Sequence, residues 1–356
     1  MRSQASAVTR RTVYPLVLDP ILKEKVWGGR RLEHYGKVLA AGSHVGESWE
    51  VADMPATSPS GGGGDEARSL ILNGLLAGRR LHDAVVEWGS DLLGDVLLTP
   101  NGDFPLLVKL LDAREHLSVQ VHPTAAYVAA HPGAHLKEES WYVVEAEPGA
   151  YLFKGLKDGV TRDTFVAAVA GGSVAELLKA WPAVPGDVYH LPSGTVHALG
   201  AGVLVAEVQT PSDTTFRIYD WAKEYNRAGR ELHVEAALAS MDFGPAAGPN
   251  RLPPGEGFAR LVETDYFSIW EVRGPATLKP PAKEGCEVVM VLSGELTLDA
   301  VDESYVAVRL AAGSTAVLPA AAGPVTAFRA AADVTYLRIQ LGPRQRETTA
   351  AGGPGT

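Results

Sequence analysis

Cysteine is almost absent from this chain. Cys286 is the only one among 356 residues, so no disulfide can form within the chain and a hydrophobic core must stabilise the fold. Such sparse use of cysteine is typical of proteins in reducing compartments, and we therefore expect a cytoplasmic protein.

The sequence also has no long apolar run and no excess of positive charge. No stretch approaches the roughly 20 apolar residues of a membrane span, and the basic N-terminus contains no apolar segment of signal-peptide length. There are 42 Asp and Glu against 32 Lys and Arg, a net charge of −10. Nucleic acid and anionic membranes are therefore not expected as partners. The sequence leaves the oligomeric state open.

The remaining composition is that of a globular protein. Hydrophobic residues make up 46% of the chain and charged residues 21%, and the length suits two or three domains. Residues 1–11, 343–356 and the glycine-rich segment 58–65 have the composition of flexible segments. A Pro- and Gly-rich stretch near Asn250 predicts a linker. We expect one domain at 12–248 and a second at 256–342.

Alternation of apolar and polar residues predicts that most of the chain is β-strand. In LSVQVHP, residues Ser118, Gln120 and His122 share one face and the two valines share the other. FPLLVKLLDA places Lys109 on an apolar face, and LKEESWYVV places Lys137 beside Glu139. Helical spacing interrupts this pattern in two places, which predicts helical insertions at about 66–95 and 161–181.

The segment Gly186–His197, GDVYHLPSGTVH, predicts a tight strand–turn–strand that ends on a histidine. Its Gly-x5-Pro-x-Gly-x2-His spacing is the second signature of the cupin barrels, where the histidine binds a metal. Upstream lie further side chains of metal-binding type. We expect a metal site formed by Gln120, His122, Glu139 and His197.

Gly313 and Pro319 repeat the Gly-x5-Pro spacing within a second run of short strands, but no histidine follows. This repeat predicts a second barrel that has no metal ligands. The expected fold is therefore mainly β, with two cupin-type (jelly-roll) barrels and inserted short helices.

Several longer blocks resemble one enzyme family in order and spacing. VGESWEV, FPLLVKLLDA, LSVQVHP, KEESWY, DVYHLPSGTVHALGAG and QTPSDTTFRIYDW are similar to blocks of the class I mannose-6-phosphate isomerases, in their short bacterial form, which belong to the cupin superfamily. The resemblance runs from about Tyr14 to Leu341. It implies interconversion of mannose 6-phosphate and fructose 6-phosphate through a cis-enediol at one zinc ion, with a phosphorylated hexose as the substrate.

The resemblance also assigns roles to individual residues. It places the zinc ligands on Gln120, His122, Glu139 and His197, an essential arginine on Arg217 and an aspartate on Asp213. The active-site lysines fall on Lys109 and Lys137, and Ser118 falls near the substrate phosphate. Longer members carry a histidine where this chain has Leu136, so no proton-transfer role passes to that position.

Some alternatives stay open at this point. Lys137, Lys109 and a water on the metal are all candidates for the proton carrier. Glu138 competes with Glu139 as the ligand, although alternation with Lys137 favours Glu139. A metal-dependent cupin dioxygenase and a non-catalytic sugar-phosphate-binding cupin are the competing functions. The basic residues at the predicted site disfavour the dioxygenase, because an apolar substrate needs no cations.

Overall fold

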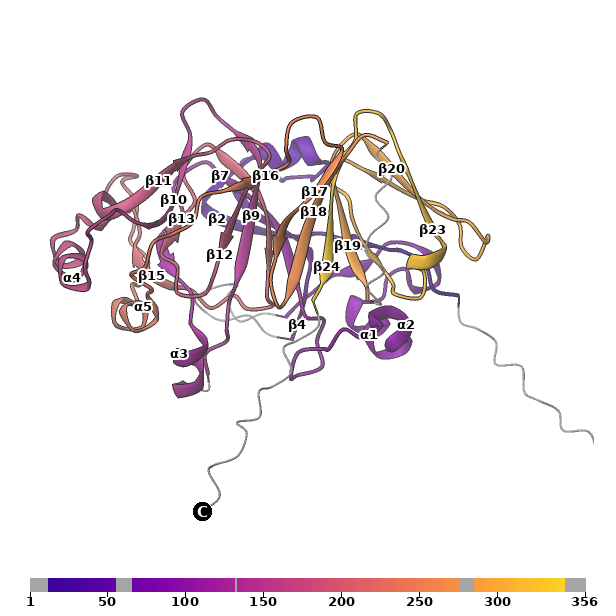
Figure 1. Ribbon diagram of the computed structural model, residues 1–356, viewed down its shortest axis with the longest axis horizontal. Coiled ribbons are helices and arrows are strands. Elements are labelled where there is room, and N and C mark those ends of the chain that lie inside the picture. Colours follow the sequence, from indigo (N-terminus) through magenta and orange to yellow (C-terminus); the bar gives the residue numbers. More distant parts are fainter. Residues whose placement is uncertain (1–11, 56–65, 132, 276–284, 343–356) are drawn as a thin grey trace, which may run out of the picture.

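The computed structural model describes residues 12–55, 66–131, 133–275 and 285–342. They form a stack of β-sheets with a few short helices at its edges (Figure 1), which confirms the mainly β fold class. The segments predicted to be flexible, 1–11, 58–65 and 343–356, lie outside the described residues. Each predicted barrel is a pair of sheets packed face to face.

The first pair, which we call the first sandwich, carries the predicted metal ligands. Its large sheet has the order β16-β12-β9-β14-β7-β2-β3, and its small sheet has the order β11-β10-β13-β8-β15. The large sheet contains β2 (Ile21–Gly29), β3 (Val45–Val51), β7 (Leu107–Ala113), β9 (Glu139–Ala146), β12 (Asp187–Leu191), β14 (Val203–Gln209) and β16 (Asn250–Arg251). The small sheet contains β8 (Val119–Val121), β10 (Tyr151–Leu156), β11 (Leu178–Pro182), β13 (His197–Ala198) and β15 (Phe216–Tyr219).

The second pair, the second sandwich, is built mainly from the C-terminal segment. Its large sheet has the order β17-β18-β24-β19-β22-β1-β6, and its small sheet has the order β21-β20-β23. The strands are β1 (Leu16–Asp19), β6 (Leu70–Ile71), β17 (Phe258–Glu263), β18 (Phe267–Arg273), β19 (Glu287–Ser293), β20 (Glu295–Ala300), β21 (Val308–Ala311), β22 (Thr315–Leu318), β23 (Thr326–Ala330) and β24 (Thr335–Leu341). A separate ribbon joins β4 (Asp53–Met54) to β5 (Ala67–Arg68).

The two sandwiches exchange strands across the predicted linker. N-terminal β1 pairs with β22, where Leu16 lies opposite Val317, and β16 from beyond residue 248 pairs with β12. The two large sheets consequently do not follow the predicted limits 12–248 and 256–342. Those limits stay a prediction about the domains, and the sheets show that neither segment completes its own sandwich alone.

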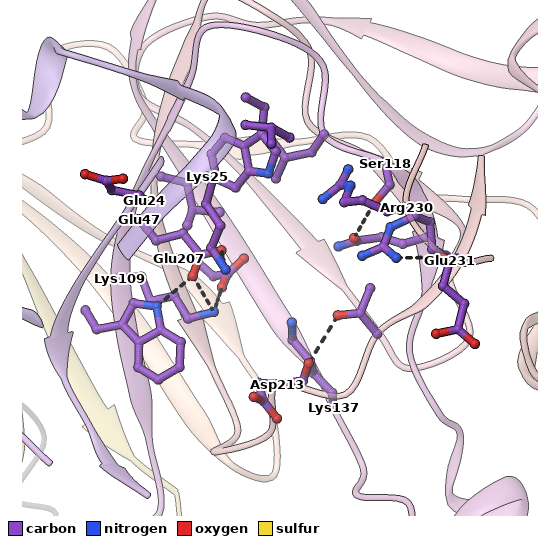
Figure 2. Close-up of a pocket in the computed structure, with 18 of the residues that line it drawn as sticks. Glu24, Lys25, Glu47, Lys109, Ser118, Lys137, Glu207, Asp213, Arg230 and Glu231 are labelled. Atoms are coloured by element: carbon purple, nitrogen blue, oxygen red, sulfur yellow. Dashed lines mark hydrogen bonds and ion pairs between the residues drawn. The ribbon is translucent and has the colours of Figure 1, made fainter. Parts of the chain in front are cut away.

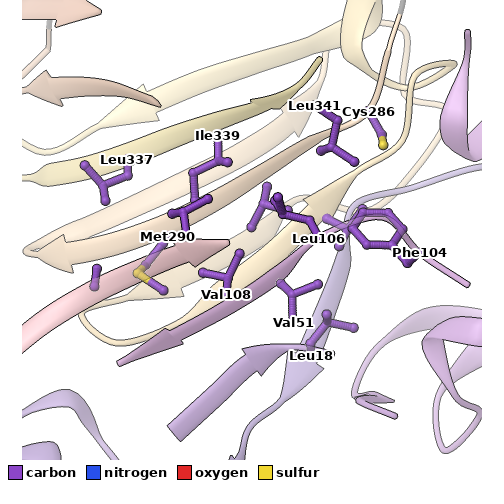
Figure 3. Packing of buried hydrophobic residues seen from close by; sticks show 14 of the residues in the cluster. Leu18, Val51, Phe104, Leu106, Val108, Cys286, Met290, Leu337, Ile339 and Leu341 are labelled. Carbon is purple, nitrogen blue, oxygen red and sulfur yellow. The ribbon is translucent and has the colours of Figure 1, made fainter. Parts of the chain in front are cut away.

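One hydrophobic core lies between the two large sheets. Figure 3 shows Val108 and Leu106 from one sandwich packed with Met290, Leu337 and Ile339 from the other. Burial of each such side chain contributes about 1.5–3 kcal/mol relative to exposure. This shared core fixes the first sandwich against the second, and it places the opposite face of the first large sheet toward its own small sheet.

Helices lie outside these sheets. The α-helices are α1 (Leu81–Trp88), α2 (Ser90–Leu93), α3 (Ala125–Ala130), α4 (Arg162–Gly171) and α5 (Val234–Ser240), and the 3-10 helices are η1 (Arg31–Tyr35), η2 (Gly74–Leu76), η3 (Val174–Leu177) and η4 (Gly323–Val325). Phe165 of α4 and Ala237 of α5 pack on the outer face of the small sheet. Among the described residues, no helix has both the length and the apolar character required to cross a membrane.

Both predicted helical insertions are partly wrong. At 66–95 the chain begins with β5 and β6, because backbone pairing of Leu70 and Ile71 with β1 overrides the weak helical spacing. At 161–181 helix α4 begins after Thr161, whose side chain caps it by accepting a hydrogen bond from Thr164 N. Gly172 then ends α4 in the left-handed conformation at φ 73°. Residues 178–182 form strand β11 and not helix.

Candidate active site

The inner face of the small sheet aligns four polar side chains. His197 pairs with Lys154 on one side and with Gln120 on the other, and Gln120 pairs in turn with Arg217. Residues directly opposite each other in a sheet point to the same face. Val119 and Val121 point to the other face and pack under the helices. The alternation read from the sequence therefore holds, and it directs Gln120, His197 and Arg217 into the first sandwich.

The large sheet supplies the carboxylate that meets this row. Glu139, the first residue of β9, is fully buried. Its Oε2 lies 3.2 Å from His122 Nε2, its Oε1 lies 3.2 Å from His197 Nε2, and Lys137 Nζ lies 3.0 Å from Oε2. The structure thus brings three of the four predicted ligands, His122, Glu139 and His197, within contact of one another.

Both histidines are oriented from behind by backbone carbonyls. His122 Nδ1 lies 3.0 Å from Thr214 O, and His197 Nδ1 lies 2.8 Å from Thr195 O. A carbonyl can only accept, so each Nδ1 carries the proton and each Nε2 turns a lone pair toward Glu139. This arrangement is typical of metal-binding histidines.

Three of the candidate ligand atoms are buried and have no hydrogen-bond partner among the described residues. His122 Nε2 and both oxygens of Glu139 are buried and make no hydrogen bond of good geometry. Buried polar atoms are rarely left in this state. A cation between them would satisfy all three atoms, and two imidazoles with one carboxylate form a donor set that suits a divalent transition metal. The residues therefore fit a metal ion.

Gln120 completes the group from the side. Its Nε2 lies 3.2 Å from His197 Nε2, and its Oε1 accepts a hydrogen bond from Ser118 Oγ at 3.2 Å. An amide binds a metal through its oxygen, so Gln120 must turn its Oε1 toward the histidines in order to act as a ligand. Ser118, expected near the substrate phosphate, touches Gln120 and lines the cavity described below.

The protonation states suit metal binding. Burial would raise the pKa of Glu139, but the adjacent Lys137 ammonium and the His122 contact outweigh it and hold that pKa well below its usual range. Burial and the Lys137 charge lower the pKa of His122 to about 3. Metal ligands must be deprotonated, so both side chains are in the form that binds a metal.

A second cluster, Asp53, His82 and Asp103, also has metal-like spacing. It differs in composition, with one imidazole and two carboxylates, and Arg68 bridges both carboxylates, 3.3 Å from Asp53 and 3.1 Å from Asp103. A guanidinium there satisfies the negative charge, so this cluster is an internal ion-pair network.

Beside the candidate metal ligands lies a cavity of about 660 Å³, and Gln120 and Lys137 are among the residues that line it. Figure 2 shows Lys109, Glu47 and Glu207 on one wall of this cavity and Arg230 on the opposite wall, with Lys137 and Asp213 between them. The predicted catalytic residues Lys109, Lys137, Asp213 and Arg217 therefore all line a single cavity.

Lys109 is held in its charged form. Its Nζ donates hydrogen bonds to Glu207 Oε1 and Gln209 Oε1, each at 2.9 Å. Burial would lower the pKa of Lys109, but Glu207 and Glu47 outweigh this and raise it above its usual value. The carboxylates around Lys109 therefore favour its protonated form, which disfavours it as a proton carrier.

Arg217 is positioned by residues that follow it in the sequence. Its Nη1 donates a hydrogen bond to Glu231 O at 2.6 Å, and its Nε lies 3.9 Å from Asp220 Oδ1. We expected Asp213 to orient this arginine. Asp213 lines the same cavity, whereas the carboxylate beside Arg217 Nε belongs to Asp220.

Three further residues near the site, His190, Glu138 and Trp141, do not line the cavity. His190 points to the opposite face of β12, where it contacts Ser140 and lies 3.6 Å from Glu138. Glu138 is thus turned away from His122 and His197, whereas Glu139 contacts both, which favours Glu139 as the candidate ligand. Trp141 is fully buried against His197, so it is a core residue.

The sequence reading missed Glu207, Asp220 and Arg230. Glu207 had a local signal, since it is a charged residue inside the apolar strand VLVAEVQ. Asp220 and Arg230 had none. Their contact depends on the loop between β15 and α5 folding back, which no periodicity records.

Comparison with known proteins identifies the family. The model of the type I phosphomannose isomerase catalytic domain matches residues 16–151. Mannose-6-phosphate isomerase ManA of Bacillus subtilis is 33% identical over 294 residues, which span 80% of this chain and 87% of the relative. The chain belongs to the type I phosphomannose isomerases.

Other relatives agree in sequence and in fold. The mannose-6-phosphate isomerase of Streptococcus mutans is 31% identical over 292 residues and is covered to 87% of its length. A crystal structure of mannose 6-phosphate isomerase from Bacillus subtilis superposes with a TM-score of 0.75 at 29% identity, covering 91% of this chain and 99% of that one. The phosphomannose isomerase fold thus includes both sandwiches.

Proposed function

We propose that this phosphomannose isomerase family member interconverts mannose 6-phosphate and fructose 6-phosphate through a cis-enediol. The observation that carries the proposal is the convergence of His122 Nε2, Glu139 and His197 Nε2 beside a cavity that also contains Lys137 and Arg217. Proton transfer next to a carbonyl needs a Lewis acid, a proton carrier and a fixed cation for the developing oxyanion. This cavity contains groups suited to each task.

We infer zinc as the metal, held by His122, Glu139, His197 and the amide oxygen of Gln120. Two imidazoles and one carboxylate are common zinc ligands, while an amide oxygen is an unusual one. When bound, the metal polarises the carbonyl and hydroxyl oxygens of the substrate. Expectations that remain predictions are a cytoplasmic location and the assignment of these ligands.

Arg217 is suited to stabilise the charge that develops on the enediolate. It lies beside Gln120 in the row of the small sheet, and the Glu231 carbonyl fixes its guanidinium. Burial, and after it the charge of Arg230, lower the pKa of Arg217 to about 10. The side chain therefore remains charged at neutral pH and offers its donors to an oxyanion without reorganising.

Two groups of the cavity wall are suited to carry the proton. Lys137 is buried beside Glu139, and Glu207 is held by Lys109 and by Trp141 Nε1 at 2.8 Å. Lys109 is not suited, because its raised pKa keeps it protonated. We assign Lys109 the role of positioning Glu207.

A coupled assay tests the proposal. Fructose 6-phosphate formed from mannose 6-phosphate is converted by phosphoglucose isomerase and glucose-6-phosphate dehydrogenase, and NADPH absorbance is recorded. We expect metal-dependent turnover that a chelator abolishes and added zinc restores. Specific binding of mannose 6-phosphate without NADPH formation would instead favour a non-catalytic binding protein. Oxygen consumption in place of isomerisation would favour a dioxygenase.

A further inference from the structure

The basic residues of the cavity are paired differently on its two walls. On one wall, the lysines face carboxylates: Lys109 Nζ lies 2.9 Å from Glu207 and 3.9 Å from Glu47, and Lys25 Nζ lies 3.2 Å from Glu47. Lys137 is likewise paired with Glu139. These lysines are already neutralised and have little capacity left for a substrate dianion.

On the opposite side of the cavity, guanidinium groups gather around one carboxylate. Arg217, Arg227 and Arg230 all lie within 3.9 Å of a single carboxylate, that of Asp220. Arg217 Nε is buried and makes no hydrogen bond. Asp213 is a further acid of this side of the cavity, and Glu231 contributes its backbone carbonyl to Arg217. The Glu231 side chain also lines the cavity, so this wall differs from the other in the sharing of one carboxylate, Asp220, among several guanidinium groups and not in net charge.

Arg230 is fixed in place for contact with a ligand. Its Nε donates to Asp220 Oδ1 at 2.6 Å, and its backbone N–H donates to Asp220 Oδ2 at 2.8 Å. Its side chain is 28% exposed, lines the cavity, and lies across it from Lys109 (Figure 2). A guanidinium anchored through one edge presents its remaining N–H groups in a rigid fork, the geometry that suits a phosphate.

We propose that Arg230, positioned by Asp220, binds the phosphate group of the sugar phosphate and so determines specificity for phosphorylated sugars. This inference rests on the proposed function. It divides the work between two arginines: Arg217, adjacent to Gln120 in the sheet, acts at the reacting carbons, while the more exposed Arg230 holds the far end of the substrate. A contact that is equally strong in the ground state and the transition state lowers KM and leaves kcat unchanged.

Arg227 provides the matched control. It shares Asp220 with Arg230, through Nη1 to Oδ2 at 2.8 Å and Nη2 to the backbone oxygen at 2.7 Å. It does not line the cavity, and its Nε faces Glu115 at 3.6 Å. Replacing Arg227 therefore disturbs the same carboxylate without removing a phosphate contact.

The test compares Arg230→Ala, Arg230→Lys and Arg227→Ala in the metal-loaded enzyme. We expect Arg230→Ala to raise KM for mannose 6-phosphate about 10- to 100-fold, the usual effect of losing charged hydrogen bonds, with kcat within a few fold of wild type. The KM of Arg230→Lys should lie between those of wild type and Arg230→Ala. Arg227→Ala should keep the wild-type KM.

A binding measurement separates this proposal from the proposed reaction. Sorbitol 6-phosphate has no carbonyl and cannot isomerise, so its Kd from calorimetry reports phosphate capture alone. We expect the Kd to rise in both Arg230 variants and not in Arg227→Ala. An unchanged Kd in Arg230→Ala, or an equal rise in Arg227→Ala, would overturn the role of Arg230. If wild type binds sorbitol 6-phosphate through Arg230 but isomerises nothing, the proposed function fails and the phosphate site stands.

Discussion

Arg338 forms a buried ion pair with Glu287 inside the second sandwich. Arg338 Nε and Nη2 donate to Glu287 Oε2 at 2.8 and 2.6 Å, and Gln340 Nε2 donates to Oε1 at 3.0 Å. Glu287 is the first residue of β19, just as Glu139 is the first residue of β9. Both carboxylates therefore begin an interior strand of a large sheet.

The strand registers make this correspondence specific. Glu139 lies opposite Leu191 and Gln209, and Glu287 lies opposite Leu318 and Gln340. Trp141, two residues after Glu139, lies opposite Glu207 on the neighbouring strand. Val289, two residues after Glu287, lies opposite Arg338. In the second sandwich a guanidinium therefore contacts this glutamate, whereas the corresponding glutamate of the first sandwich faces two imidazoles. Pro324 stands five residues after Pro319, where His197 stands five after Pro192.

Arg338→Met should destabilise the protein without affecting the active site. Removing the guanidinium partner of a buried carboxylate typically lowers the free energy of unfolding by about 3–5 kcal/mol. Urea unfolding should show this loss, and the double variant Glu287→Leu/Arg338→Met should recover most of it. Metal content and kcat should stay at wild-type values in both variants. An Arg338→Met variant as stable as wild type would contradict the stabilising role of this ion pair. A variant that loses metal would contradict the prediction that the second sandwich binds no metal.

His197→Ala should lose its bound metal, because it removes one of two imidazoles in the ligand set. His190→Ala is the matched control. It lies seven residues earlier on the same strand–turn–strand segment but points to the opposite face. Elemental analysis of both variants after dialysis should show metal only in the His190 variant. Full occupancy and activity in His197→Ala would remove it from the site.

The parts of the site that the sequence predicted are those encoded within single strands. Gln120 and His122 alternate with core valines on β8, and the glycine–proline turn before His197 is a local backbone pattern. Contacts between distant segments carry no such local pattern. The pairing of β1 with β22 depends on the completed fold, and so does the ion pair of Arg230 with Asp220. The repeated Gly-x5-Pro motif is a local pattern, so it predicted the second sandwich. The contact of Arg338 with Glu287 joins two distant strands and therefore could not be predicted.

Lys154→Met should stabilise the protein at neutral pH. Burial lowers the pKa of Lys154 from 10.5 to about 8, and its Nζ donates a hydrogen bond to the Ala247 carbonyl, a neutral acceptor, at 3.0 Å. Below pH 8 the folded state holds a buried charge at a free-energy cost. Between the two pKa values the unfolded state binds more protons, so wild-type stability rises with pH there.

The pH dependence of the difference between variant and wild type checks this sign. The gain in unfolding free energy should be largest at about pH 7 and should shrink toward zero as the pH approaches 10.5. Lys157→Met, at an exposed lysine of the same segment, should show no such trend. A gain for Lys154→Met that is constant with pH would mean that the effect comes from packing and not from the charge.

Arg217→Ala should impair the reaction while leaving the fold and the metal site intact. Arg217 lies beside Gln120, its Nη1 is held by Glu231 O, and its charge is placed to meet the oxygen charge that builds as the enediol forms. Loss of one such preorganised donor lowers turnover by about 10²- to 10³-fold, or roughly 3–4 kcal/mol of transition-state stabilisation. We therefore expect kcat for mannose 6-phosphate to collapse while KM, metal content and Tm change little. This is the reverse of the pattern expected for Arg230→Ala, which raises KM. If Arg217→Ala raised only KM, both arginines would bind the phosphate, and the stabilisation of the enediolate would have to come from the metal and Lys137.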